Sequence, residues 1–450
     1  MKKFIMNALA LSNEQLELID NISHVNDYDI EITLKAKPQF CPKCNLQTTR
    51  IKDYYKRKIS HSILLNRDTT IFYNRRRYFC KHCNASFIES NPFTMKDQSK
   101  VSSYSIINIL NDLKPYNSTF SAVARKYNIS TTKVIEIFDS YVQIPRKPLS
   151  RCLNLDEFYF NRHSKYKYAF MIMDFERKVI LDILESRHCS HLSNYFFNIP
   201  LVERNKVEYI CIDMYRVYRS ITLEYFKKAT VCIDSFHVVK KVNDTLNAVR
   251  KRIMRTYKVD EDSIEYRLLK YRYKLLLKNE DDINSYRFYY DRMLHYHTTE
   301  NRVLEDILNI HKDLRIAYKL KEQYLHFNNI EEIKYDKATA ENHFRLIVEA
   351  MKISEIEEFI ECSKTLKNWK AEILNSFVWI GGRRISNGPI EGKNNYLKKI
   401  INNANGLKNF QRARNRFIFS QNLYEKHSLV KHENTIKQHG NKRGNYKKKD

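Results

Sequence analysis

Three acids lie where they could hold divalent metal ions. Asp156 lies in the apolar segment LNLDEF, Asp213 follows the apolar run YICI, and Glu391 lies in SNGPIEGKNNY. An acid that directly follows a buried strand lies at the C-terminal edge of a sheet, where α/β proteins bind their ligands. Carboxylates supplied by two strands and one helix can converge on two metal ions, which activate the attacking oxygen and stabilise the leaving oxygen of a phosphodiester. The pattern therefore favours metal-dependent phosphodiester chemistry.

Each acid also has a purely structural interpretation. Asp156 could pair with a neighbouring Arg, and Asp213 could cap the helix that follows it. Glu391 would be the acid of a capping box if Gly388 were the N-cap and Pro389 the first helical residue. The three acids taken together, in this order and in a basic chain, favour the metal-binding interpretation.

The composition favours a polyanionic partner. The 450 residues include 79 Lys and Arg against 52 Asp and Glu, and the formal net charge is +27. Lys and Arg attract phosphates, and their association with a polyanion gains from released counterions. An AT-rich genome would enrich Lys but would not deplete the acids. We therefore expect a nucleic-acid-binding protein rather than a chain whose charge serves only solubility.

The sequence also indicates a compartment. No segment approaches the roughly 18 apolar residues that a membrane span needs, and the first residues turn polar too early for a signal peptide. Nine Cys, an odd number without a secretory signal, favour reduced thiols and a metal site over a disulfide framework. These observations predict a soluble, intracellular protein.

Two CxxC pairs, FCPKC at 40–44 and FCKHC at 79–83, predict a zinc ribbon. The expected ligands of this structural Zn²⁺ are Cys41, Cys44, Cys80 and Cys83. Four thiolates leave no open position for chemistry, and a redox pair is the alternative. The segment TTIFYNRRRYF at 69–79 predicts a strand that leads into the second pair. Arg76 and Arg77 on it could contact phosphate or could form a solvated strand edge.

A block of helices follows the ribbon. The segment 103–113 has helical periodicity, and 118–141 predicts two further helices broken at 127–129, with Ser118 and Ser130 as N-caps. This arrangement favours a helix-turn-helix, although three-helix units that bind no DNA are common. The residues that would face the major groove are Ser130, Thr131, Thr132 and Lys133.

The chain as a whole predicts a multidomain α+β protein. Strand-like segments at 152–160, 167–175 and 178–186 form a meander, and two buried strands follow at 207–215 and 230–234. The expected domains are a zinc ribbon at 1–95, a helix-turn-helix at 96–143, a linker at 144–150, an α/β catalytic domain at 151–238 and 375–431, an all-helical insertion at 239–374 and a basic disordered tail at 432–450.

The sequence resembles the bacterial insertion-sequence transposases of the ISL-three group. The motifs that carry the resemblance are CPKC and RRRYFCKHC, LDEF around Asp156, IDMYRVY around Asp213, IDSFHVVKKV at 233–242, SNGPIEGKNNYLK around Glu391 and NANGLKNFQRARNRFIF at 403–419. The resemblance covers nearly the whole chain, is weakest in the helical insertion and is absent from the tail.

The resemblance implies an RNase H-like DDE domain with Asp156, Asp213 and Glu391 as the catalytic triad, holding Mg²⁺ or Mn²⁺. Asp234 and His237 match an Asp-x-x-His element with a supporting role, either positioning a DNA strand or holding the fold. A polar strand end with a structural His is the alternative. The further residues expected to contact DNA are Lys393, Lys398, Arg412, Arg414 and Arg416.

The activity implied by the resemblance is DNA transposition, in the bacterial cytoplasm and in association with the nucleoid. The ribbon and the helix-turn-helix would bind terminal inverted repeats of double-stranded DNA. The metal site would cut the element end and then join the freed 3′-hydroxyl to target DNA. Joining two ends implies at least a homodimer. The alternatives are a non-catalytic DNA-binding regulator derived from a transposase, and a nuclease that performs no strand transfer.

Overall fold

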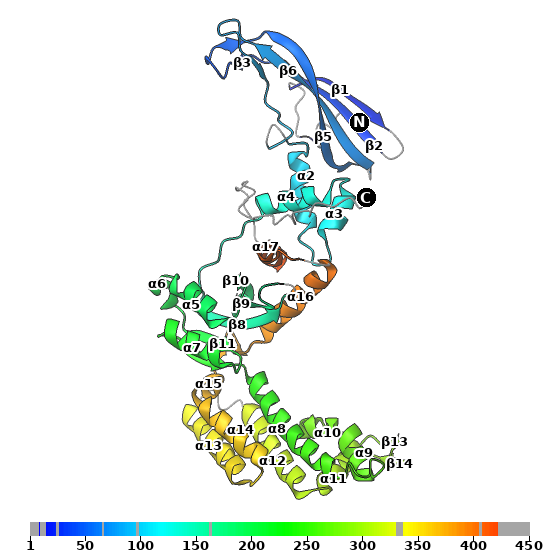
Figure 1. Ribbon diagram of the computed structural model, residues 1–450, viewed down its shortest axis with the longest axis vertical. Helices are drawn as coiled ribbons and strands as arrows, with labels where there is room; N and C mark the ends of the chain where they lie inside the picture. The colour runs from blue at the N-terminus through cyan, green and yellow to red at the C-terminus, as the bar shows by residue number, and fades with distance from the viewer. Residues whose placement is uncertain are drawn as a thin grey trace, which may run out of the picture. The chain divides into compact units, whose positions relative to one another are not determined.

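The computed structural model describes residues 9, 15–23, 27–64, 67–95, 99–161, 164–329, 336–404 and 407–421. The predicted tail at 432–450 lies outside these residues. The chain divides into two compact units, Met1–Pro145 with Lys399–Asp450, and Arg146–Lys398 (Figure 1). Both strands and helices are present, so the predicted α+β class is confirmed. No helix of the described ranges is long and apolar enough to cross a membrane.

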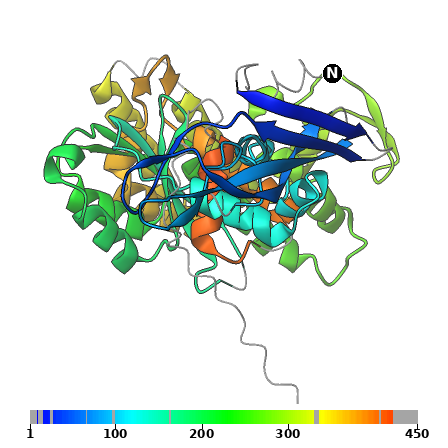
Figure 2. The same ribbon diagram turned by 90° about the horizontal axis from the view of Figure 1, so that it is seen from above.

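The first unit contains a five-stranded sheet that extends well beyond a zinc ribbon. Its strands are β1 (Leu16–Ser23), β2 (Asp27–Leu34), β5 (Ile51–Leu64), β6 (Arg67–Phe79) and β7 (Ser86–Ile88). The order is β1-β2-β6-β5, with β7 beside β6, and the strands lie side by side in both views (Figures 1 and 2). The strand predicted at 69–79 is thereby confirmed as part of β6. Alternate residues of the strands face a core that includes Ile30, Ile32, Ile59 and Ile71.

Three helices follow the sheet: α2 (Ser103–Asp112), α3 (Phe120–Lys126) and α4 (Thr131–Tyr141). Ser130 caps α4, as predicted, because its Oγ accepts a hydrogen bond from the Lys133 N–H. The predicted cap Ser118 is wrong by one residue. Thr119 caps α3 instead, because its extended backbone lets Oγ1 accept from the Ala122 N–H at 3.1 Å.

The C-terminal helix α17 (Phe410–Gln421) belongs to this first unit. The sequence analysis assigned residues 375–431, which include α17, to the catalytic domain, and that assignment stays a prediction. Phe419 packs edge-to-face on Phe138 of α4, with ring centroids 5.9 Å apart. Arg412 forms an ion pair with the fully buried Asp139 at 2.6 Å. Apolar and ionic contacts therefore attach α17 to the predicted recognition helix.

A second five-stranded sheet lies in the unit Arg146–Lys398. Its strands are β8 (Cys152–Tyr159), β9 (Tyr168–Asp174), β10 (Val179–Leu184), β11 (Tyr209–Ile212) and β12 (Thr230–Ile233). The order is β10-β9-β8-β11-β12. The meander β8-β9-β10 is antiparallel, as predicted, whereas β11 runs parallel to both β8 and β12. The connecting helices are α5 (Cys189–Phe197), α6 (Leu201–Arg204) and α7 (Arg216–Tyr225).

The insertion after β12 is mainly helical. Its helices are α8 (Ser235–Thr256), α9 (Ile264–Tyr271), α10 (Lys274–Leu277), the 3-10 turn η1 (Glu280–Asp282), α11 (Glu300–Asn309), α12 (Lys312–Asn329), α13 (Lys337–Ile353), α14 (Glu357–Asn368) and α15 (Lys370–Asn375). The prediction of an all-helical insertion is wrong in one place. Strands β13 (Tyr289–Asp291) and β14 (Tyr296–Thr298) form a hairpin, where buried Asp291 pairs with Arg272 and accepts from two turn N–H groups.

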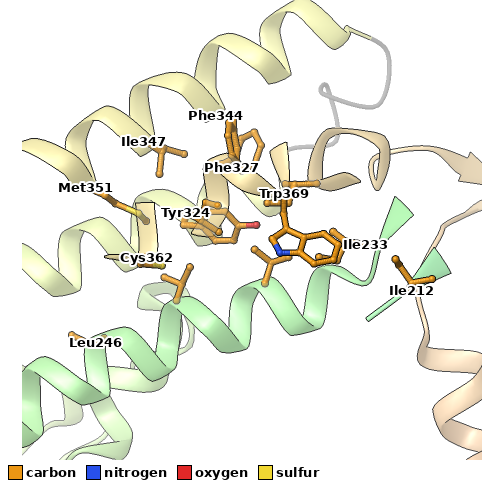
Figure 3. Packing of buried hydrophobic residues seen from close by; sticks show 14 of the residues in the cluster. Ile212, Ile233, Leu246, Tyr324, Phe327, Phe344, Ile347, Met351, Cys362 and Trp369 are labelled. Carbon is orange, nitrogen blue, oxygen red and sulfur yellow. The ribbon is translucent and has the colours of Figure 1, made fainter. Parts of the chain in front are cut away.

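The insertion and the sheet share one hydrophobic core. Ile212 of β11 and Ile233 of β12 belong to the same buried cluster as Leu246 of α8, Met351 of α13 and Trp369 (Figure 3). Burying apolar side chains in one continuous core stabilises the elements cooperatively. The helical insertion is therefore part of the same compact unit as the sheet.

A short hairpin leads from the insertion to the last helix of this unit. Strands β15 (Trp379–Ile380) and β16 (Arg383–Arg384) are joined by Gly381 and Gly382, whose positive φ angles of 58° and 78° favour glycine. Helix α16 (Gly388–Ala404) follows. Ile380 and Ile385 pack on Cys152, Cys211 and Cys232 of three adjacent strands. This packing fixes the hairpin, and with it the start of α16, against the sheet.

Candidate catalytic site and zinc ribbon

Asp156 lies within β8 and is 8% exposed. Its Oδ2 accepts a hydrogen bond of 2.6 Å from Asn394 Nδ2 of α16, and its Oδ1 accepts one of 2.7 Å from the Glu157 N–H. Burial and then the charge of Asp213 raise the pKa of Asp156 to about 8. A positive charge beside this carboxyl group would lower its pKa again and favour the ionised carboxylate.

The neighbouring acid Glu157 is occupied elsewhere. Its carboxylate pairs with Arg187 and accepts a hydrogen bond from the Tyr218 hydroxyl. Because successive side chains of a strand point to opposite faces, Asp156 and Glu157 face different surroundings. The alternation within LDEF thus leaves Asp156, and not Glu157, beside α16.

Asp213 directly follows β11 and is half-buried. Its Oδ1 accepts a hydrogen bond of 2.7 Å from Asn387 Nδ2, and its Oδ2 lies 3.1 Å from His237 Nε2. Helix α7 begins at Arg216 with Tyr215 as its N-cap and no side-chain capping bond. The alternative role of Asp213 as a helix cap is therefore not realised.

Glu391 is the fourth residue of α16. Its N–H donates to the Asn387 carbonyl at 2.9 Å, which puts Asn387, and not Gly388, at the N-cap position. The capping-box alternative is therefore wrong by one position. The half-buried Glu391 carboxylate forms no hydrogen bond or ion pair with any described residue, although its charge helps to raise the pKa of Asp234, after burial as the main cause.

The structure groups Asp213 with Asp234 and His237. One ligand atom from each of these side chains lies within 4.8 Å of the other two. The hydrogen bond to Asp213 raises the pKa of His237. Asp156, Asp213 and Glu391 come from β8, the end of β11 and α16, but within the described ranges they do not form such a group. Their joint role as metal ligands stays a prediction.

Asn387, at the start of α16, connects this helix to β8 and to the ends of β11 and β12. The sequence analysis did not identify it as a site residue. Besides its one hydrogen bond to Asp213, Asn387 donates its backbone N–H to Asp234 Oδ1 at 3.2 Å, and its Oδ1 accepts from Asn154 Nδ2 at 2.8 Å. Asn394 of α16 likewise donates a hydrogen bond to Asp156, and so connects the same helix to β8. The only available signal was the Asn content of SNGPIEGKNNY, which also suits turns and helix caps.

The zinc ribbon is built from two matching turns. Strands β3 (Gln39–Phe40) and β4 (Gln47–Thr48) pair around the first CxxC. In each turn the first Cys donates its N–H to the residue five positions later, at 2.9 Å. The residues after the second Cys, Asn45 and Asn84, both have φ of 57°. Two turns of the same shape thus present their sulfurs to one point.

The four sulfurs fit a zinc ion. They all lie within 4.8 Å of one another, and the pairs Cys41–Cys83 and Cys44–Cys80 are each separated by 3.5 Å. Four sulfurs at about 2.3 Å from a tetrahedral zinc ion are about 3.8 Å apart. The pKa of Cys41 is lowered to about 6, mainly because its sulfur accepts a hydrogen bond from the backbone N–H of Cys44. A lower pKa favours the thiolate, which is the form that binds metal.

Most arginines that were predicted to contact DNA have partners inside the chain. Arg76 is fully buried and pairs with Glu17 and Glu89, and Arg77 pairs with Asp53 at 3.2 Å. In α17, Arg414 donates to the Ile144 carbonyl and Arg416 to the carbonyls of Pro115 and Ser118, in addition to the Arg412–Asp139 pair. Burial of Arg76, Arg414 and Arg416 argues against their predicted phosphate contacts. Arg77 and Arg412 are partly exposed, but each already forms an ion pair with an acid of the chain.

Other predicted contact residues are accessible. Ser130, Thr131 and Thr132 are exposed at the start of α4, where Lys133 pairs with Glu136 at 3.0 Å. Lys398 is exposed on α16. The half-buried Lys393 lies near Lys178, and its pKa is lowered by burial and then by that positive charge.

Comparison with known proteins identifies the class. Residues 153–417 match the profile of the ISL3 transposase family, with its DDE domain, and residues 37–83 match the zinc finger of the transposases of IS204, IS1001, IS1096 and IS1165. The first match covers more than half of the chain, so this protein belongs to the ISL3 family of transposases. The transposase of insertion sequence element IS1001 from Bordetella parapertussis is 21% identical over 377 residues, which is 83% of this chain and 86% of that protein. The family resemblance seen in the sequence is thereby confirmed.

Proposed function

We propose that this protein is a DNA transposase that binds the terminal inverted repeats of an insertion sequence and performs metal-dependent phosphodiester hydrolysis and strand transfer. The observation that carries the proposal is the attachment of α16 to the predicted catalytic acids. Asn394 holds Asp156 and Asn387 holds Asp213, so the segment that bears Glu391 is tied to both.

The sheet supports an RNase H-like catalytic domain. Three antiparallel strands are followed in space by two parallel ones, and the acids lie on β8 and directly after β11, two neighbouring strands. Ligands of such mixed sheets gather at the C-terminal ends of the parallel strands. A helical insertion between β12 and α16 is compatible with this arrangement, because the shared core holds the two parts of the domain together.

The side chains fit a divalent cation such as Mg²⁺ or Mn²⁺. Carboxylate oxygens are the donors that these ions prefer, and the Glu391 carboxylate has no partner among the described residues. Asp156, Asp213 and Glu391 would hold the ion. When bound, it would supply activation of the attacking oxygen and stabilisation of the leaving oxygen.

The surrounding residues orient the acids and the substrate. Asn394 and Asn387 each donate to one carboxylate oxygen, which fixes the direction of the remaining lone pairs. Lys393 and Lys178 place two positive charges close together beside α16, where they would attract the phosphates of a DNA strand. Positioning by fixed groups is a large part of catalysis in phosphoryl transfer.

DNA recognition is assigned to the first unit. In this proposal α4 is a recognition helix, and Thr131 and Thr132, which are exposed at its start, contact the bases in the major groove. The ribbon, held by structural Zn²⁺, would extend the contact with the repeat. Joining two element ends to a target requires at least two copies of the chain, so we propose a homodimer or higher oligomer on DNA.

A strand-transfer assay tests this function. Purified zinc-loaded protein is incubated with Mg²⁺, a pre-cleaved element end and a target plasmid. Joined products are expected from the wild type and not from Asp213→Asn. Cleavage of uncut ends without any joining would instead identify a nuclease, and specific binding without either reaction would identify a DNA-binding regulator.

A further inference from the structure

We propose that Asp213, Asp234 and His237 form a binding site for a divalent transition-metal ion with one nitrogen and two oxygen ligands. This inference deepens the function proposed above and rests on it, because Asp213 also belongs to the predicted triad. The proposed site differs from the triad because Asp234 and His237 are its ligands in place of Asp156 and Glu391. The inference also assigns to the Asp-x-x-His element a direct role, instead of a supporting one.

Local structure explains why these side chains meet. Strands β11 and β12 pair in parallel with Ile212 opposite Ile233, so Asp213 and Asp234 both follow the paired residues at the same edge. The Asp234 N–H continues the ladder by donating to the Ile212 carbonyl at 2.8 Å. His237 lies three residues after Asp234, in the first turn of α8, so the two side chains lie on the same face of the helix.

A buried oxygen without a partner points to a missing ligand. Asp234 is 2% exposed, and its Oδ1 accepts from the Asn387 N–H. Its Oδ2 is buried and forms no hydrogen bond with any described residue. A buried carboxylate oxygen that lacks a partner costs free energy, and native proteins avoid this arrangement except at sites with a function or a bound ion.

The distances suit coordination of one ion. His237 Nε2 lies 3.1 Å from Asp213 Oδ2 and 3.9 Å from Asp234 Oδ2. Ligands at about 2.1 Å from an octahedral ion are about 3.0 Å apart when they are neighbours. A small inward movement of the Asp234 side chain would therefore complete the set.

The donor set also indicates the class of metal. Imidazole nitrogen is a ligand for Zn²⁺, Fe²⁺ and their neighbours, whereas Mg²⁺ prefers oxygen ligands alone. One nitrogen with two carboxylates therefore favours Mn²⁺ or a softer divalent ion over Mg²⁺. The open coordination positions would be available to water or to a phosphate oxygen of DNA.

Electron paramagnetic resonance with Mn²⁺ tests the proposal on the zinc-loaded, full-length protein. Pulsed spectra of the wild type are expected to show coupling of bound Mn²⁺ to an imidazole nitrogen. His237→Ala should remove this coupling and weaken Mn²⁺ binding at least about tenfold, in line with the loss of metal-site ligands or their supports. His297→Ala, which changes an exposed His of β14, is the matched control and should behave as the wild type.

Two further variants keep the test independent of folding. His237→Asp should retain Mn²⁺ without the nitrogen coupling and shift the preference toward Mg²⁺. Glu391→Gln should abolish DNA cleavage but keep the coupling. Absence of nitrogen coupling in the wild type, or coupling that persists in His237→Ala, would overturn the proposal. If instead the proposed function is wrong, the wild type would still show Mn²⁺ coupled to nitrogen but would neither cleave nor join DNA.

Discussion

Asn387 donates a hydrogen bond of 2.7 Å to Asp213, although 174 positions separate the two residues in the chain. The bond joins the end of β11 to the start of α16. The backbone N–H of the same Asn holds Asp234, and its side-chain oxygen accepts from Asn154. One amide side chain therefore determines how the segment that bears Glu391 meets the sheet.

Loss of this amide should reduce activity more than stability. Asn387→Ala is expected to lower the rate of DNA cleavage at least about a hundredfold, because displaced acids lose their alignment. The free energy of unfolding should fall by about 1–3 kcal/mol, since buried polar partners remain unsatisfied. Single-turnover cleavage and urea unfolding measure the two effects. Asn395→Ala, an exposed position of the same helix, is the control, and equal rates for both variants would refute this role.

The ion pair between Arg412 and Asp139 should be essential for the first unit. Asp139 is fully buried, so Arg412→Ala leaves an uncompensated charge, and we expect a loss of about 3–5 kcal/mol. Hydrogen exchange of the α4 and α17 amides reports this change. Lys408→Ala removes an exposed positive charge near the same helix and should leave exchange unchanged. Similar protection in both variants would mean that α17 does not stabilise α4.

His61 should make the first unit sensitive to acid. It lies in β5, is 6% exposed, and contacts Ser102 Oγ at 2.8 Å. Burial lowers its pKa from 6.5 to about 4, so the folded state resists protonation that the unfolded state accepts. The stability contributed by neutral His61 is full above pH 6.5 and is lost as pH falls toward 4, by at most roughly 3 kcal/mol.

Comparison with His61→Gln isolates this effect. Hydrogen exchange of β5 should accelerate in the wild type between pH 6.5 and 4 relative to the variant at each pH. The comparison removes contributions that both proteins share, such as protonation of the zinc ligands. Identical pH profiles for the two proteins would show that His61 is not protonated on unfolding in this range.

One zinc ion per chain is expected from the ribbon. Cys44→Ser should lose this zinc and weaken binding to the terminal repeats, because structural zinc supplies folding free energy to small domains. Elemental analysis and DNA-binding titrations measure both results. Cys189→Ser, which changes an exposed thiol outside the cluster, should keep the metal. A Cys44→Ser protein that retains stoichiometric zinc would place the ion elsewhere.

Local patterns in the sequence predicted much of the fold. The CxxC pairs, the apolar runs of β8 to β12 and the Ser130 cap depend on neighbours in the chain, so they could be identified directly. The Thr119 cap and the β13–β14 hairpin were missed because the competing choices, Ser118 and a continuous helix, have similar propensities.

Long-range partners could not be predicted from the sequence. Nothing local distinguishes the buried Arg76 and Arg416 from arginines that bind phosphate, because both kinds occur in the same basic patterns. Asn387 is likewise recognisable only when β11 and α16 are seen together. Composition predicted the charge of the chain, but only folding decides which charges face inward.

The most direct test of the account is hydrolysis of a labelled element end in Mg²⁺ by the wild type and by Asp156→Asn, Asp213→Asn and Glu391→Gln. Asp182→Asn, a change at a buried acid of β10 in the same sheet, is the control. We expect the wild type and the control to release a 3′-hydroxyl at comparable rates, and each of the other three variants to be at least about a thousandfold slower. Cleavage by Glu391→Gln at the wild-type rate would contradict the central claim that these three acids act together.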